Sequence, residues 1–429
     1  MRVTASAPPR RSRRAVAAVF ALNGFLAAMW VAHIPVISER TDVAHDELGG
    51  LLLILGGSAF FGMQLCGPLI DRFGSRPLTV AAATVLAAII LTPVLAVDIR
   101  TLGAALAAFG FANGSLDVSM NAQAVAVERA YRRPIMSSFH GWFSAGSLVG
   151  SGIVALTLWT DVGVVPTVAG AAVVGLGVVA YAARDLLPHD AGLEPDDGVS
   201  ASSGAGPDPD AGGTTATGGP TTGAPTTGAD GSWWSRVDRR RLILLAVVAF
   251  GLMLGEGTAY DWSALQVVES FGTSEALGAV AFGAFSATMT VTRFVIDPVV
   301  GSVGAVRVLR AGALVGIAGM VLAICVPVPA LAIAGWAVFG VGLAGLIPQI
   351  FTAAGNLTDG TGGRTISFVV GFGYLGLLAG PAVVGFISSR TCLNVGLIAA
   401  VAALLPAVWL AGVVRPGDES VSAVGEPRT

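Results

Sequence analysis

Long apolar runs, each about twenty residues in length, alternate along this chain with short polar segments. A helix needs about 20 apolar residues to cross the hydrocarbon core of a bilayer. Runs of that length predict an all-α integral membrane protein with twelve transmembrane helices, six on each side of a polar segment. The predicted helices cover residues 15–37, 48–70, 77–97, 101–127, 135–158, 162–183, 242–268, 276–300, 305–328, 330–355, 365–388 and 393–414.

The polar segment at 185–235 differs in composition from everything around it. It consists mostly of Gly, Ala, Thr, Pro and Asp and contains a near repeat, Gly-Pro-Thr-Thr-Gly-Ala-Pro-Thr-Thr-Gly. Such a sequence has little apolar surface to bury, so we predict a disordered linker. The chain then divides into a tail at 1–14, a six-helix half at 15–184, the linker at 185–235, a second six-helix half at 236–414 and a tail at 415–429.

Composition agrees with a membrane protein and excludes several functions. Hydrophobic residues make up 54% of the chain and charged residues 12%, whereas soluble domains have about 25% charged residues. No basic patch indicates nucleic-acid binding. The sequence has no His-Glu-x-x-His, no Gly-x-Ser-x-Gly and no phosphate-binding loop, so we expect neither an enzyme nor ATP-driven transport. The three cysteines lack the spacing of metal ligands, and we expect no cofactor and no metal.

The arginines predict the orientation of the helices. With the N-terminus inside, twenty of the 24 basic residues fall in cytoplasmic segments, and three, Arg40, Arg100 and Arg390, fall on the other side. Cytoplasmic loops of membrane proteins carry this excess of positive charge. We therefore expect a multi-pass protein of the bacterial inner membrane with both termini in the cytoplasm.

The two halves repeat short patterns. Phe109-Gly110 opens the fourth predicted helix and Phe339-Gly340 opens the tenth, while Ser138-Phe139 and Ser367-Phe368 open the fifth and eleventh. Two six-helix halves related by an axis along the membrane normal are typical of one large class of secondary transporters.

The loop after the second helix reads Gly67-Pro-Leu-Ile-Asp71-Arg72-Phe-Gly74-Ser75-Arg76. It resembles the signature of the major facilitator superfamily, G-x-x-x-D-R-x-G-R-R, except that Ser75 replaces a basic residue. The resemblance implies a conformational latch that closes the cytoplasmic side and opens when the carrier faces inward. The predicted latch residues are Gly67, Asp71, Arg72, Gly74, Arg76 and, in the second half, Arg293 and Asp297.

A second stretch, Leu116-Asp117-Val-Ser-Met-Asn121-Ala-Gln123 followed by Arg133-Pro-Ile-Met-Ser-Ser-Phe-His140-Gly-Trp142, narrows this resemblance. It is similar to the branch of the superfamily that contains the fucose permease and a membrane protein of rhizopine catabolism. The similarity implies a small polyhydroxylated or amino-sugar-like substrate.

Ionisable residues inside predicted spans are candidate functional residues, because a charge in hydrocarbon costs several kcal/mol. Asp117 lies near the middle of the fourth helix, and Glu256 near the middle of the seventh. A low-dielectric environment favours the neutral form of a carboxyl group, so either residue can bind and release a proton. We predict proton coupling through Asp117 first and Glu256 second. The alternative for Asp117 is a structural polar contact between helices.

Polar and aromatic residues on the same faces are candidate substrate ligands. Asn113 and Asn121 share one helix face with Asp117, because residues four apart in a helix lie above one another. His140 can equally satisfy a nearby carbonyl group, and Trp30 can equally anchor the first helix at the interface. The predicted substrate-binding residues are Asn23, Trp30, Asn113, Asn121, Gln123, His140, Tyr260 and Gln349.

The sequence therefore predicts a secondary transporter in the lipid bilayer. We expect it to bind a small molecule and a coupling proton and to work as a monomer. Proton symport is the favoured mechanism, and proton-driven efflux of drugs or metabolites is the alternative. Antiporters of the superfamily often carry a Gly-Pro motif in the fifth helix, where this chain has Gly146-Ser-Leu-Val-Gly150-Ser-Gly152. A non-transporting receptor is a third hypothesis, disfavoured by the intramembrane carboxylates.

Overall fold

The computed structural model describes residues 9–43, 45–188, 233–235, 237–358, 360 and 362–415. Most of the predicted linker and parts of both predicted tails lie outside these residues. In the first half, the described helices are α1 (Pro9–Arg40), α2 (His45–Phe73), α3 (Ser75–Ile89), α4 (Leu91–Leu95), α5 (Ile99–Tyr131), α6 (Met136–Trp159) and α7 (Val164–Ala182).

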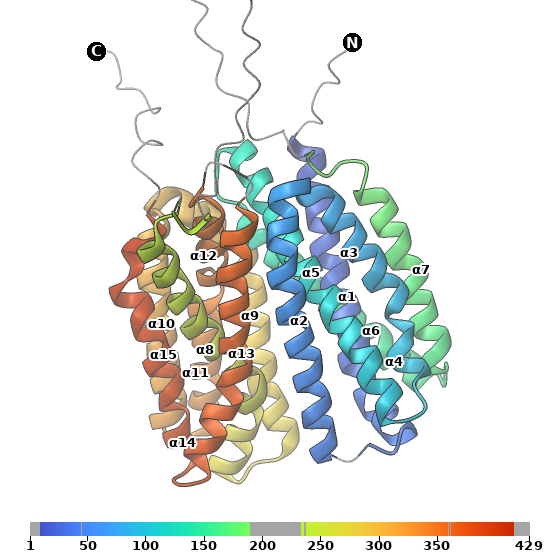
Figure 1. The fold of residues 1–429 in the computed structure, drawn as a ribbon. Coiled ribbons are helices and arrows are strands. Elements are labelled where there is room, and N and C mark those ends of the chain that lie inside the picture. The colour runs from blue at the N-terminus through green and yellow to red at the C-terminus, as the bar shows by residue number, and fades with distance from the viewer. Residues whose placement is uncertain are drawn as a thin grey trace, which may run out of the picture.

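The second half consists of η1 (Trp233–Ser235), α8 (Arg239–Phe271), α9 (Glu275–Val303), α10 (Ala305–Cys325), α11 (Pro329–Leu343), α12 (Leu346–Gly355), α13 (Gly363–Ser388), α14 (Leu393–Gly396), α15 (Ile398–Trp409) and η2 (Ala411–Val414). Figure 1 shows the two halves side by side, the first coloured blue to green and the second yellow to red.

The predicted fold class is confirmed. Among the described residues, 10 helices are long and apolar enough to cross a bilayer. The remaining two predicted spans are α5, which is long but carries the polar stripe around Asp117, and the shorter pair α14 and α15. The first helix begins at Pro9, earlier than predicted, because proline fits the first turn of a helix, where its missing N–H is not needed.

Three predicted spans are each built from two helices. The third breaks between α3 and α4, ahead of Pro93, and the tenth breaks at Ala344 and Gly345 between α11 and α12. Pro348 follows this second break and removes the N–H that would have bonded the carbonyl of Ala344. The twelfth span divides at Leu397, between α14 and α15.

Glycines let neighbouring helices approach closely, and they do so in the same way in both halves. A Cβ atom on Gly110 of α5 would lie 2.2 Å from the carbonyl oxygen of Leu55 on α2. A Cβ atom on Gly340 of α11 would lie 2.3 Å from the carbonyl oxygen of Phe285 on α9. Small residues at such crossings are typical of helix packing in membranes. The repeat seen in the sequence thus corresponds to an equivalent packing site in each half.

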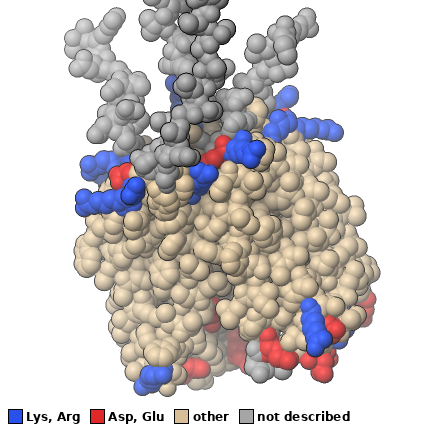
Figure 2. All heavy atoms as spheres, in the orientation of Figure 1, with Lys and Arg blue, Asp and Glu red and all other residues tan. Residues whose placement is uncertain are grey.

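Charges separate between the two ends of the bundle. At one end, Arg13 lies over the ring of Tyr131, Arg76 donates to the carbonyl of Ala183, and Arg241 donates to the carbonyl of Val413. We call this the arginine-rich end. Figure 2 shows arginines gathered there, whereas Asp and Glu predominate at the opposite end, where the surface is hollowed between the halves.

Candidate substrate and proton site

A buried ion pair joins two helices of the second half at the centre of the bundle. Arg293 on α9 donates from Nη2 to Oε1 of Glu256 on α8 at 3.1 Å. The Tyr260 hydroxyl donates to the same oxygen at 3.3 Å. Arg293 Nη1 donates to Ser144 Oγ on α6 at 3.0 Å, so the pair also contacts the first half. Glu256 is therefore held beside a permanent positive charge.

Asp117 lies near the middle of α5 in a different electrostatic setting. Its side chain is buried, and Oδ1 accepts a weak hydrogen bond from Asn121 Nδ2 at 3.4 Å. The carboxyl group interacts with the hydroxyl of Tyr374 on α13, in the other half. No ion pair to Asp117 is found within the described part of the chain. Asp117 is thus an acid without a cation beside it.

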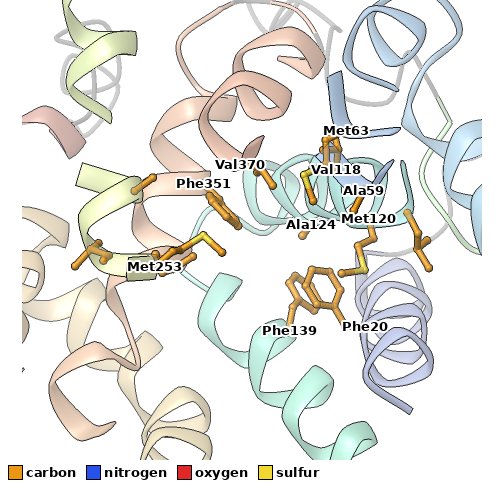
Figure 3. Packing of buried hydrophobic residues seen from close by; sticks show 14 of the residues in the cluster. Phe20, Ala59, Met63, Val118, Met120, Ala124, Phe139, Met253, Phe351 and Val370 are labelled. Atoms are coloured by element: carbon orange, nitrogen blue, oxygen red, sulfur yellow. The ribbon is translucent and has the colours of Figure 1, made fainter. Parts of the chain in front are cut away.

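His140 lies on α6 between the ion pair and an apolar layer. Its ring packs edge-on against the ring of Phe20, with centroids 5.3 Å apart. It also packs, at a tilt, against the ring of Phe351, with centroids 5.8 Å apart. Phe20 in turn stacks on Phe139 at 5.6 Å. Figure 3 shows Phe20 and Phe139 against each other, with Phe351 across from them. Rings from both halves therefore form an aromatic layer next to the polar centre.

Several buried polar atoms around this centre have no hydrogen-bond partner among the described residues. Buried polar groups in proteins almost always have a partner, so each such atom is a candidate contact for a bound molecule. Of the predicted substrate ligands, this group includes atoms of Asn23, Asn113, Asn121, His140 and Gln349, and it also includes Asp117 Oδ2 and Arg293 Nε.

Two predicted ligands lie elsewhere. Gln123 points into the first half, where Nε2 donates to Ser75 Oγ and to the carbonyl of Leu187, both at 2.9 Å. Its Oε1 accepts from the backbone N–H of Leu187 at 3.1 Å. Trp30 belongs to the buried apolar core. We therefore leave Gln123 and Trp30 out of the proposed site.

Replacing Gln123 by leucine should lower stability without changing substrate affinity. The change leaves the Leu187 backbone groups and the Ser75 hydroxyl without their partner, at a cost of roughly 1–3 kcal/mol. Thermal unfolding of the purified protein in detergent would show a lower Tm, and binding assays should give an unchanged Kd for any transported compound. An unchanged Tm with weakened binding would return Gln123 to the substrate site.

Asp71, one of the predicted latch residues, joins the two halves at the arginine-rich end. Asp71, at the end of α2, accepts hydrogen bonds from the backbone N–H groups of Gly363 at 2.8 Å and Arg364 at 3.3 Å. These two residues begin α13, so the carboxylate meets the positive end of that helix dipole. The side chain of Arg364 adds an ion pair at 3.7 Å.

Asp297 makes the equivalent contact from the second half. At the end of α9 it accepts from the backbone N–H groups of Ser137 at 3.0 Å and Ser138 at 2.8 Å, which begin α6. Glu128 of α5 accepts from the preceding two N–H groups, Ile135 and Met136, both at 2.8 Å. Its other oxygen accepts from Thr352 of α12 at 2.7 Å. Carboxylates from both halves therefore share one helix end.

The other predicted latch residues have different places. Gly74 adopts a positive φ of 82°, which allows the tight turn between α2 and α3, and Gly304 does the same between α9 and α10 with φ 88°. Arg76 binds within the first half, and exposed Arg72 lies over the ring of Phe73. The structure places Arg293 in the central ion pair rather than at the latch.

Three residues of these sites are not among the site residues predicted from the sequence. Tyr374 and Ser144 carry no charge, and only the packing of α13 and α6 brings them to Asp117 and Arg293. Glu128 falls on nearly the same face of α5 as Asp117, and this position in the sequence indicates a buried polar residue. Its hydrogen bond from Thr352, however, depends on how the two halves pack together.

Comparisons with known proteins agree with this arrangement. No protein-family model matches the chain. An uncharacterised transporter of the major facilitator type from Yersinia pestis is 32% identical over 381 residues, covering 88% of each chain. The membrane protein MosC of Rhizobium meliloti is 28% identical, over 90% of this chain and 85% of MosC.

Among solved structures, FucP in the outward conformation superposes with a TM-score of 0.72 at 13% identity, covering 94% of this chain and 98% of FucP. A second FucP structure, of the Escherichia coli fucose:proton symporter, gives a TM-score of 0.71 at 12% identity. At such low identity the likeness concerns the fold.

Proposed function

The chain belongs to the major facilitator superfamily of transporters, and from that premise we propose that it carries a small polar solute by alternating access with a proton. The proposed solute is a sugar, a cyclitol or an amino-sugar-like compound. The observation that carries the proposal is Asp117, a carboxyl group buried at the centre of the bundle with no ion-pair partner among the described residues.

The arginine-rich end is proposed to face the cytoplasm. Cytoplasmic loops carry the excess of arginine in membrane proteins. The hydrogen bonds that join the halves in the described residues lie at that end or near mid-bundle, from Asp71 and Asp297 to Ser144. With this orientation, the proposed carrier faces outward and its cytoplasmic side is closed.

Asp117 and Glu256 are proposed to have different roles. Glu256 is paired with Arg293, so the charge of a carboxylate at this position is balanced in the empty carrier. Asp117 has no such compensation, and burial favours the neutral form of a lone carboxyl group. We therefore assign to Asp117 the proton that enters from outside and leaves inside. Protonation removes the buried charge and allows the loaded halves to reorient.

Adding the transported compound to lightly buffered, de-energised cells that express the protein should make the medium more alkaline. Asp117→Asn should abolish this proton uptake, because an amide cannot exchange a proton. Asp261→Asn removes an exposed carboxyl group on α8 and serves as the matched control. If no sugar or cyclitol changes the external pH, and cells instead expel cationic or aromatic compounds, the efflux alternative replaces symport.

A further inference from the structure

A hydrogen-bond donor of the buried Arg293 lacks an acceptor. Arg293 is 5% exposed. Its Nη1 donates to Ser144 and its Nη2 to Glu256, but Nε has no partner in the part of the chain that the structure describes. A buried donor without an acceptor is costly, and a charged one more so. The empty site is therefore short of an acceptor at the guanidinium group.

The contact between Arg293 and Glu256 is made at a single point. Only Nη2 and Oε1 meet, and Oε1 is shared with the hydroxyl of Tyr260. A guanidinium group fits a carboxylate best through two parallel hydrogen bonds. The geometry thus leaves Arg293 able to bind a second carboxylate, and leaves Glu256 in a contact that a two-point pair can replace.

The unpartnered atoms on α5 have the opposite character. Asn121 Nδ2 donates to the backbone carbonyl of Asp117 at 2.8 Å. The other side-chain atom of Asn121, Oδ1, is an acceptor without a partner among the described residues. Oδ2 of Asp117 is the next such atom, one turn away on the same helix. Acceptors suit the hydroxyl groups of a polyol. The site is therefore divided into an acceptor face on α5 and a donor on α9.

We propose that the substrate is a polyhydroxylated carboxylate, a sugar acid, whose carboxylate binds Arg293 in place of Glu256 while its hydroxyl groups bind α5. This inference rests on the proposed transport function and narrows its substrate class. One carboxylate replaces another at the same guanidinium group, so the positive charge of Arg293 stays neutralised throughout.

The exchange also requires a proton. Glu256, once released from Arg293, takes one proton from the solvent of the open side, so the net charge of the site is the same before and after the anion binds. The titratable groups that face Glu256 are Tyr260 on α8, Arg293 on α9 and Tyr374 on α13. His140 on α6 lies beside Arg293. This proton is distinct from the one assigned to Asp117.

Binding to the purified full-length protein tests the substrate class. The compounds are glucuronate, galacturonate and gluconate, each compared with glucose, galactose and sorbitol by intrinsic tryptophan fluorescence. We expect the acids to bind about tenfold or more tightly than the neutral compounds, a difference that reports the pairing with arginine. Arg293→Lys should remove this preference, because lysine keeps the charge but cannot donate two parallel hydrogen bonds to a carboxylate. The control variant Asp261→Asn should keep the preference for the acids.

A second variant tests the exchange at Glu256. In the wild type, the affinity for the acids should fall as the pH rises, by up to about tenfold per pH unit, because binding takes up a proton. In Glu256→Gln the acids should still bind, and the part of the pH dependence that comes from the proton at Glu256 should be lost, whereas any part that comes from Asp117 should remain. If Glu256→Gln keeps the full pH dependence of the wild type, the proposed exchange is wrong.

The two proposals fail in different ways. If neutral sugars bind and enter cells with a proton while the acids do not bind, the inference is wrong and the proposed function stands. If the acids bind to the protein but neither they nor the neutral compounds cross the membrane, the proposed function is wrong. If neither kind of compound binds, both proposals are wrong.

Discussion

Replacing Gly67 by leucine is expected to abolish transport, because the carrier can then no longer close at the arginine-rich end. A Cβ atom at this position would lie 2.5 Å from Ser367 Cβ and 2.9 Å from the carbonyl oxygen of Gly363. Both belong to α13 of the opposite half and form the start of the helix that Asp71 caps. A leucine side chain at this crossing forces α2 and α13 apart, so the hydrogen bonds of Asp71 cannot form.

Two measurements check this result. Uptake of the transported compound should fall to background, and a cysteine placed at Ser138, which is 7% exposed, should become reactive to an impermeant thiol reagent in inside-out vesicles. The background for labelling is a variant without Cys66, Cys325 and Cys392. Gly57→Leu is the control on the same helix, since a Cβ atom there meets nothing within 4 Å. Normal uptake by Gly67→Leu would show that closure does not need this close approach.

Replacing Arg293 by alanine is expected to destabilise the protein far more than removing the whole ion pair. The single change leaves Glu256 buried without its counter-charge, which typically costs about 3–5 kcal/mol. In the double variant with Arg293→Ala and Glu256→Ala, no charge is left uncompensated, so much of the stability should return.

Thermal unfolding in detergent measures both variants. The single variant should show a markedly lower Tm, and the double variant should lie between it and the wild type. Glu256→Gln alone should be milder than Arg293→Ala if water reaches the guanidinium group from the open side. Equal Tm values for the single and double variants would contradict this prediction, because the loss of Arg293 would then cost the same whether or not Glu256 is left behind without its partner.

The fold could be predicted from the sequence because each span carries its own signal. A run of about twenty apolar residues identifies a membrane helix without reference to its neighbours. The breaks in the third and tenth spans were less evident. Pro93 and Pro348 mark them, but proline is also tolerated within membrane helices, as Pro298 and Pro381 are here.

The site was less predictable, because it depends on which side chains meet between helices. Asp117 and Glu256 could be chosen from their cost in hydrocarbon alone. Arg293 shares its helix with Asp297, and their spacing of four suggested a common role at the latch. The structure instead directs Arg293 to Glu256 and Asp297 to the start of α6. Gln123 has the same polarity as a substrate ligand, and only its contacts reveal a structural role.

The caps at the arginine-rich end have a consequence for the speed and direction of the transport cycle. Asp71 and Asp297 together hold four backbone N–H groups across the interface. Each of these four hydrogen bonds contributes about 0.5–1.5 kcal/mol net of the hydrogen bonds to water that it replaces. Together they favour the conformation closed at the arginine-rich end by roughly 2–6 kcal/mol in the empty protein. A bias of about 2.7 kcal/mol already corresponds to populations of 99:1, because each 1.4 kcal/mol is a factor of ten. If that end faces the cytoplasm, the resting carrier would wait almost entirely with its site open to the outside. A solute arriving from that side would bind without first having to shift the equilibrium, and the bias would have to be overcome later, when the loaded carrier turns inward.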